Sequence, residues 1–216
     1  MRSALSVLAV VLAAVGIGYL LGSKPDEGQR GNSAPASDPS RASATTQTGT
    51  DGPTFWDLVA DTRVEAGNDT GRQSELLEER LSRLPAKQIV DFQRNRRRLD
   101  ERAYTWDLWG AAYVIEDGCS DDCFRDFRGY LISLGREAYA AAMRDPDSLA
   151  PIVQDAEQGD WENADDVAPD AYGSATGEDF PLDDSDVEGD PRGEPWDDED
   201  VEALVQRYPA LAERFR

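Results

Sequence analysis

The sequence predicts a mainly α-helical protein, with an N-terminal transmembrane helix and a single helical-bundle domain that carries an acidic C-terminal extension. Three observations lead to this fold class. An uncharged apolar run opens the chain, apolar residues recur at helical spacing from residue 54 onward, and strand signals are sparse. About 160 residues remain after the N-terminal segments, a size typical of one domain.

The apolar run at residues 4–22 is long enough to be a membrane helix. It contains no charged residue, and an α-helix of this length spans about 28 Å, close to the thickness of the hydrocarbon core. A cleavable signal peptide is the alternative, because Gly16 and Gly18 are small residues at the spacing of a cleavage site. The apolar run continues past them through Leu21, so we interpret residues 1–22 as an uncleaved transmembrane anchor.

Basic residues are nearly balanced across this run, with Arg2 before it and Lys24 and Arg30 after it. An N-terminal helix with a short positive start usually acts as a signal anchor, so we expect the domain to lie outside the cytoplasm. Residues 23–53 are rich in small and polar residues and lack aromatic ones. They cannot bury enough apolar surface to offset the ordering of their backbone, and we predict a disordered linker.

Caps and apolar stripes predict the first three helices of the domain at residues 54–216. Thr54 is a helix cap, and Asp57 stands where it completes a capping box. A leucine stripe predicts the second helix, which Pro85 ends, and the third begins near Ala86. The third helix carries a basic run, Arg94, Arg96, Arg97 and Arg98. We interpret this run as a solvated face paired with nearby acids rather than as an anion-binding patch.

The stretch at residues 104–134 predicts two helices around a turn. Small and apolar residues recur at helical spacing over residues 104–116, and Gly118 ends this helix. Ser120 caps the next helix, in whose first turn carboxylates are favourable. Further helices are expected over residues 136–143 and 198–207, and an acidic loop over about 177–200.

Charge and composition exclude several classes of function. Residues 151–216 hold 21 of the 44 acidic residues but only 4 of the 22 basic ones, so the net charge of -22 lies mainly near the C-terminus. Such a field repels phosphate backbones, and we expect no nucleic-acid partner. Histidine is absent, which removes the usual general base near neutral pH. No nucleophile–base pair or complete metal set is recognisable, so we expect no catalytic residue, no metal and no cofactor.

The aromatic and polar block around the predicted turn is where we expect a site if there is one. The candidate binding residues are Trp106, Asp107, Trp109, Tyr113, Cys119, Asp121, Asp122, Arg128, Arg136 and Glu137. Each also has a structural interpretation, which we favour. Aromatic residues at helical spacing usually pack in a core, the two aspartates cap a helix, and Arg128 with Glu137 is expected to form an ion pair between two helices.

Cys119 and Cys123 are the only cysteines. The surrounding acids disfavour a thiolate, and with it a cysteine nucleophile. Two thiols without a histidine do not complete a structural zinc site. Their i,i+4 spacing allows a disulfide if the domain lies in an oxidising compartment, whereas thiols stay reduced in the cytoplasm.

Several motifs together are similar to a known family. The segments TFWDLV, WDLWGAAYVIEDGCSDDCFRDFRGYLISLGREAY, DPDSLA and AYGSATGEDFP resemble an uncharacterised bacterial family, the domain of unknown function numbered 4240, over about residues 54–214. Cys123 departs from the family pattern, which has a small residue there. The resemblance implies a bacterial protein and a helical fold, but no established activity. With the predicted anchor, it implies a single-pass protein of the bacterial cytoplasmic membrane.

These observations favour a membrane-tethered, non-catalytic binding or scaffolding module. It is held by residues 4–22 and engages a protein partner through an acidic and aromatic surface. The alternative is a metal-dependent enzyme or metal-binding module built on the turn at residues 119–122. A third possibility, an acidic mimic of nucleic acid, is disfavoured by the membrane anchor.

Overall fold

Nine α-helices and two short 3-10 helices make up the part of the chain that the computed structural model describes, residues 54–154, 161–181, 189–197 and 200–216. The α-helices are α1 (Phe55–Ala66), α2 (Thr70–Leu81), α3 (Ala86–Ala103), α4 (Trp106–Ile115), α5 (Asp121–Ser133), α6 (Arg136–Ala142), α7 (Val167–Thr176), α8 (Val201–Arg207) and α9 (Pro209–Phe215). The 3-10 helices are η1 (Pro146–Leu149) and η3 (Glu162–Asp165). Over these residues the only β pairing is an isolated bridge, so the predicted mainly helical class is confirmed.

The predicted anchor at residues 1–22 and linker at 23–53 lie outside the described residues. Among the helices just named, none combines the length and the apolarity that crossing a bilayer requires.

The start of α1 confirms the capping box predicted from the sequence. The Thr54 hydroxyl accepts a hydrogen bond from the Asp57 N–H at 3.3 Å, and the Asp57 carboxylate accepts one from the Thr54 N–H at 3.0 Å. A further hydrogen bond from the Thr54 hydroxyl stabilises the ionised carboxylate and holds the pKa of Asp57 below its ordinary value. The first helix therefore begins at the residue that the sequence pattern indicates.

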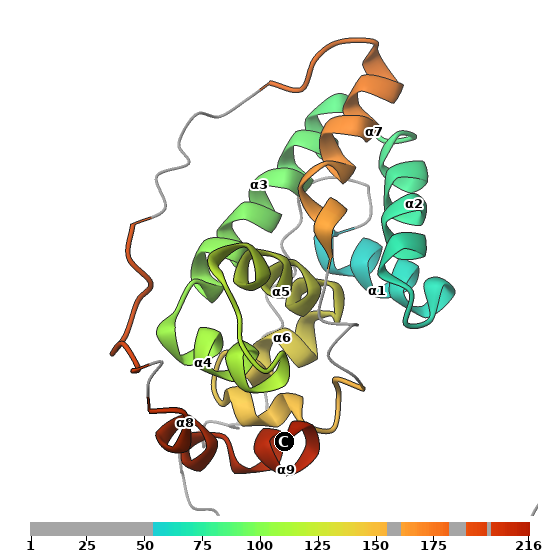
Figure 1. Cartoon of the computed structure of the whole chain (residues 1–216). Coiled ribbons are helices and arrows are strands. Elements are labelled where there is room, and N and C mark those ends of the chain that lie inside the picture. The colour runs from blue at the N-terminus through green and yellow to red at the C-terminus, as the bar shows by residue number, and fades with distance from the viewer. Residues whose placement is uncertain (1–53, 155–160, 182–188, 198–199) are drawn as a thin grey trace, which may run out of the picture. The chain divides into compact units, whose positions relative to one another are not determined.

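Buried side chains from α1, α2 and α5 meet in the interior. The fully buried Gln73 of α2 donates hydrogen bonds to the carbonyl oxygens of Val59 and Ser133, at 3.3 and 3.2 Å, and so joins three helices. In Figure 1, α7 lies between α2 and α3. It buries Val167, Ala168 and Ala171, whose small volumes allow the close approach of three helices.

The C-terminal part contains more helix than the sequence predicts. The single helix expected at residues 198–207 is α8, which begins at Val201 and is followed directly by α9, while α7 lies in a region for which no helix was predicted. Leu204, Tyr208 and Leu211 are buried and belong to the same hydrophobic core as α4. The acidic extension therefore returns to the helical domain and becomes part of its core.

Candidate functional site

The helix α4 positions the aromatic residues of the candidate site. Thr105 has an extended backbone, and its hydroxyl accepts a hydrogen bond from the Leu108 N–H at 3.2 Å, so the helix begins at Trp106. Gly110 packs so closely against Tyr208 that a Cβ on the glycine would lie 2.9 Å from the phenolic oxygen. Glycine at this position thus allows the C-terminal helices to approach α4.

Three half-buried side chains of α4, Trp106, Trp109 and Tyr113, form what we call the aromatic surface. The rings of Trp106 and Trp109 are stacked, with centroids 5.2 Å apart and planes 8° apart. Trp109 stacks in turn on the buried Phe124 of α5, at 5.0 Å and 9°. The aromatic surface is therefore the outer end of a stack that continues into the core.

Residues 189–197, which we call the docked segment, lie against this surface. The Trp196 indole N–H donates a hydrogen bond to the carbonyl oxygen of Trp106 at 2.9 Å. Its ring meets those of Trp106 and Trp109 edge to face, at 5.9 and 6.3 Å, and lies 5.0 Å from that of Tyr113. Trp196 is not among the candidate residues predicted from the sequence. A lone tryptophan in an acidic stretch was the available signal that this stretch returns to the domain.

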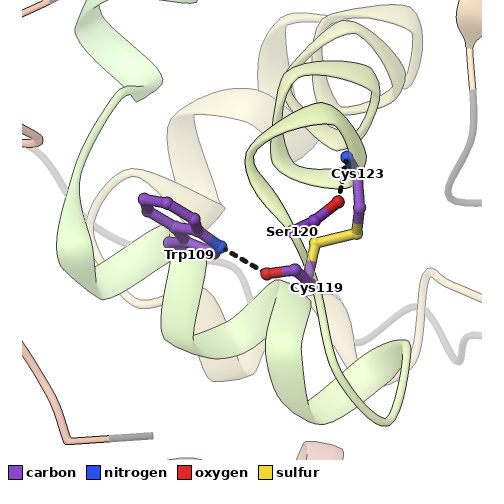
Figure 2. Close-up of a disulfide and its surroundings, with 4 residues drawn as sticks. All are labelled: Trp109, Cys119, Ser120 and Cys123. Atoms are coloured by element: carbon purple, nitrogen blue, oxygen red, sulfur yellow. Dashed lines mark hydrogen bonds between the residues drawn. A yellow bond between two sulfur atoms is a disulfide. The ribbon is translucent and has the colours of Figure 1, made fainter.

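The turn between α4 and α5 carries a disulfide, shown in Figure 2. Cys119 and Cys123 are bonded through their sulfur atoms, with Cα atoms 5.3 Å apart. The Cys119 carbonyl accepts a hydrogen bond from the Trp109 indole N–H at 3.0 Å, and the Ser120 hydroxyl caps α5 by accepting one from the Cys123 N–H at 3.3 Å. The predicted cap is thus confirmed, and the turn is fixed to the aromatic surface through Trp109.

The candidate carboxylates do not meet in one place. Asp121 and Asp122 are exposed in the first turn of α5, where Asp122 pairs with Arg125 at 3.1 Å. Asp107 of α4 instead interacts with the C-terminal helices: it pairs with Arg207 at 2.6 Å and accepts a hydrogen bond from the Tyr208 hydroxyl at 3.1 Å. Burial raises the pKa of Tyr208, and the negative charge of Asp107 adds to this shift.

No group of three or more acidic or cysteine side chains in the described part of the chain is arranged to hold a metal ion. Asp121 and Asp122 instead occupy the place at which carboxylates interact favourably with the N–H groups of a helix start.

Arg128 is fully buried and packs against the inner end of the aromatic stack. Its guanidinium carbon lies 4.5 Å from the ring centroid of Tyr104 and 5.3 Å from that of Phe124. Its ion pair is with Asp100 of α3 at 3.4 Å, so the predicted pair with Glu137 is wrong. Asp100 approaches Arg128 from a helix distant in sequence, which helical spacing alone does not reveal.

Arg96 corrects the interpretation of the basic run as a solvated face. Its side chain is only 6% exposed and pairs with Asp165 of η3, whereas Arg94 is exposed and pairs with Asp91 as expected. Burial lowers the pKa of Arg96, and the nearby charge of Asp100 opposes that shift. One arginine of the run therefore faces the interior, where η3 supplies the carboxylate that it requires.

The last two candidate residues lie apart from the aromatic surface. Arg136 and Glu137 are exposed in the first turn of α6, and the Arg136 guanidinium carbon lies 6.0 Å from the ring centroid of Trp56 in α1. The residues that the structure brings together are therefore Trp106, Trp109, Tyr113 and Cys119. Asp107 borders this group, whereas the pair on α6 does not belong to it.

An open depression of about 590 Å³ lies beside α7 and was not predicted from the sequence. Its lining residues are mostly acidic or small: Glu78, Pro169, Asp170, Gly173, Ser174, Glu178, Asp179 and Phe180. The four carboxylates come from α2, from α7 and from the residues after α7, so only the fold brings them together.

Comparison with known proteins identifies the family. Residues 51–174 match the family described as "Protein of unknown function (DUF4240)". The chain belongs to this family. The match ends before the docked segment, α8 and α9, so the resemblance expected as far as residue 214 is found over a shorter range. The aromatic surface and both cysteines lie within the family range, whereas Trp196 lies outside it.

No curated protein and no solved structure matches the chain.

Proposed function

We propose that this protein is a membrane-tethered, non-catalytic binding or scaffolding module. In this proposal residues 4–22 anchor the chain in the bacterial cytoplasmic membrane, and the helical domain lies outside the cytoplasm. The domain engages a protein partner through the aromatic surface and the acids around it. The net charge of -22 argues against a nucleic acid as that partner.

One observation carries the proposal: partly exposed Trp and Tyr side chains gather on α4, and stacking on a core residue restricts their motion. Trp106 and Trp109 stack at 5.2 Å, and Phe124 supports Trp109 from the core. Aromatic residues of this kind supply much of the binding energy in protein interfaces, because they bury a large area at a small cost in conformational entropy. A rigid aromatic surface therefore favours a binding role.

The alternative function is a metal-dependent enzyme or metal-binding module at the turn of residues 119–122. It requires several carboxylates around one cation. Asp121 and Asp122 are exposed at the start of α5, and Glu137 is exposed at the start of α6. Carboxylates so placed interact with solvent and with their own helix starts, which favours the binding module over the alternative.

Site-specific photo-crosslinking in native membranes tests the proposal. A benzophenone side chain replaces Asp121, which is exposed beside the Cys119 turn, and a matched variant carries it at Val64, which is 85% exposed on α1. We expect a discrete adduct with one protein from position 121 and not from position 64. The same adducts from both positions, or none from position 121, would contradict a specific surface.

Calorimetry with Ca²⁺, Mg²⁺ and Mn²⁺ separates the two functions. The proposal predicts no saturable binding to the purified protein. One-to-one binding that is lost in the Asp122→Asn variant, with an unchanged circular dichroism spectrum, would favour the metal-dependent alternative.

A further inference from the structure

The docked segment contacts the domain at the connection between α3 and α4, where backbone N–H and carbonyl groups lack hydrogen-bond partners within the two helices. Arg192 forms an isolated parallel β-bridge with Thr105: its N–H donates to the Tyr104 carbonyl at 3.1 Å, and its carbonyl accepts from the Trp106 N–H at 2.9 Å. The first N–H groups of a helix have no acceptor within the helix. The docked segment therefore supplies an acceptor to the start of α4 (Figure 1).

The side chain of Arg192 binds the end of the preceding helix. Its guanidinium donates hydrogen bonds to the carbonyl oxygens of Glu101 and Arg102, in the last turn of α3. The last carbonyls of a helix lack intrahelical donors and carry partial negative charge, so a cation is favourable there. A single arginine thus satisfies groups at two helix ends, through its backbone and its side chain.

Trp196 is the second point of attachment, four residues after Arg192. Its indole covers the aromatic surface and donates to the Trp106 carbonyl. Between the two, Gly193 has a φ of 97°, a conformation that residues with side chains rarely adopt. The chain turns at this glycine between its two attachment points.

The attachment is shallow. Within the docked segment only Pro191 and Trp196 are partly buried, and its other residues are exposed. The helices that follow are held independently, because Leu204 and Leu211 are buried in the core. Segments with few buried apolar contacts open at a small fraction of the global free energy of unfolding. The docked segment can therefore leave α4 while α8 and α9 stay in place.

We propose that residues 189–197 are an internal ligand that occupies the aromatic surface, and that the partner displaces them with an extended segment of the same chemistry. That segment supplies an arginine, a glycine directly after it and a tryptophan four residues after the arginine, in the same chain direction. This inference rests on the proposed function, because it requires α4 to be a protein-binding surface.

Binding of a peptide in trans tests the displacement. The probe is a fluorescent peptide of residues 189–197, GDPRGEPWD, added to the full-length protein in detergent. In the Arg192→Ala/Trp196→Ala variant the internal competitor is weakened, so we expect at least tenfold tighter peptide binding than in the natural protein. A matched peptide with the Arg and Trp positions exchanged is expected not to bind. Absence of peptide binding to a variant with unchanged circular dichroism, or equal binding of the exchanged peptide, would overturn the inference.

Hydrogen exchange of the natural protein gives a second test that does not depend on the variant folding. The Arg192 N–H and the Trp196 indole N–H are expected to exchange at least tenfold faster than the Ala212 N–H of α9, which donates to the Tyr208 carbonyl. Equal protection of the three groups would show that the docked segment opens only with the core. Photo-crosslinking of a partner without peptide binding would remove this inference and leave the proposed function standing.

Discussion

Arg128 holds a positive charge in the interior of the domain, where only 1% of the residue is exposed. Removing such a charge from water costs several kcal/mol unless another charge and hydrogen bonds compensate for it. Asp100 supplies the opposite charge at 3.4 Å, and the Tyr104 and Phe124 rings flank the guanidinium. The stack that supports the aromatic surface therefore ends on an ion pair between the buried Arg128 and the partly buried Asp100.

We predict that Asp100→Asn destabilises the fold by about 3 kcal/mol, because it leaves the Arg128 charge buried beside a neutral amide. The matched control is Asp91→Asn on the same helix, whose carboxylate pairs with the exposed Lys87 and Arg94. The control is expected to lose less than about 1 kcal/mol. Urea unfolding monitored by circular dichroism measures both. Equal losses would show that the pair with Arg128 contributes no more than a surface pair.

Tyr139 predicts a pH dependence of stability. Its hydroxyl donates to the Leu99 carbonyl at 2.7 Å, and burial raises the pKa of Tyr139 from 10.0 to about 12. Between these two values the unfolded chain releases the phenolic proton while the folded protein retains it. The free energy of unfolding therefore falls as the pH rises from 10 to about 12.

The Tyr139→Phe variant removes this titration and one hydrogen bond. We expect a loss of about 1 kcal/mol at pH 8 and a smaller further decrease above pH 10 than in the natural protein. Part of the decrease remains, because the pKa of Tyr208 is raised in the same direction. Urea unfolding at pH 8, 10 and 11 tests this. Identical pH slopes in the two proteins would contradict the assignment to Tyr139.

The N-terminus of helix α9 is capped by a carboxylate from another part of the chain. The two oxygens of Asp147 in η1 accept hydrogen bonds from the Ala210 and Leu211 N–H groups, at 3.0 and 2.9 Å. Tyr208 precedes α9 without a side-chain cap, so Asp147 takes the place of the local capping residue. This contact ties the last helix to η1 across about 60 residues of sequence.

We predict that Asp147→Ala loosens the C-terminal helices, because it removes two hydrogen bonds and one favourable charge at the start of α9, with a loss of about 1 kcal/mol. Hydrogen exchange is expected to accelerate at the α8 and α9 amides and to stay unchanged in α3. Asp170→Ala, in the first turn of α7, is the matched control and should leave α9 unaffected. Uniform acceleration over all helices would indicate that α9 does not open separately.

Features that depend on residues close in sequence were predicted, whereas features that depend on distant residues were not. Thr54 and Ser120 were predicted as caps because a cap and its acceptors lie within three residues of each other. The helix α7 was not predicted, because its buried residues are mostly alanine and produce no apolar stripe. Burial of Arg96 and docking of Trp196 depend on partners more than 60 residues away, which no periodicity reports.

The same difference between local and distant interactions applies to the candidate site. Trp106, Trp109 and Tyr113 were named as candidates from their density in the sequence, and their i, i+3, i+7 spacing in α4 puts them on one side of that helix. Arg136 and Glu137 were included because they follow the same dense block in sequence, yet in α6 the Arg136 guanidinium lies over Trp56 of α1 and Glu137 is exposed. Nearness in sequence was a reliable guide within one helix and a poor one across the α5–α6 connection.

The proposed membrane anchor, together with the length of the predicted linker and the charge of the chain, leads to an expectation for where the domain stands. A flexible chain of 31 residues, the length of the linker predicted at 23–53, would span about 30 Å in root-mean-square terms. Anionic lipid headgroups repel a protein of net charge -22, so the domain is expected to stand away from the bilayer within the reach of this linker. The membrane then does not block the aromatic surface on α4, and a partner in the compartment that holds the domain can reach it and the docked segment.

That compartment decides the redox state of the two cysteines, which are partly exposed and therefore accessible to reagents. If the domain lies outside the cytoplasm, the disulfide between Cys119 and Cys123 persists there. We predict that a membrane-impermeant maleimide labels intact cells only after an impermeant reductant has been added. The Cys119→Ser variant, which leaves one thiol at Cys123, is expected to be labelled without the reductant. The opposite orientation predicts that a permeant maleimide labels the natural protein without any reductant, and that the impermeant maleimide labels neither protein. That result would place the domain in the cytoplasm and contradict the proposed orientation.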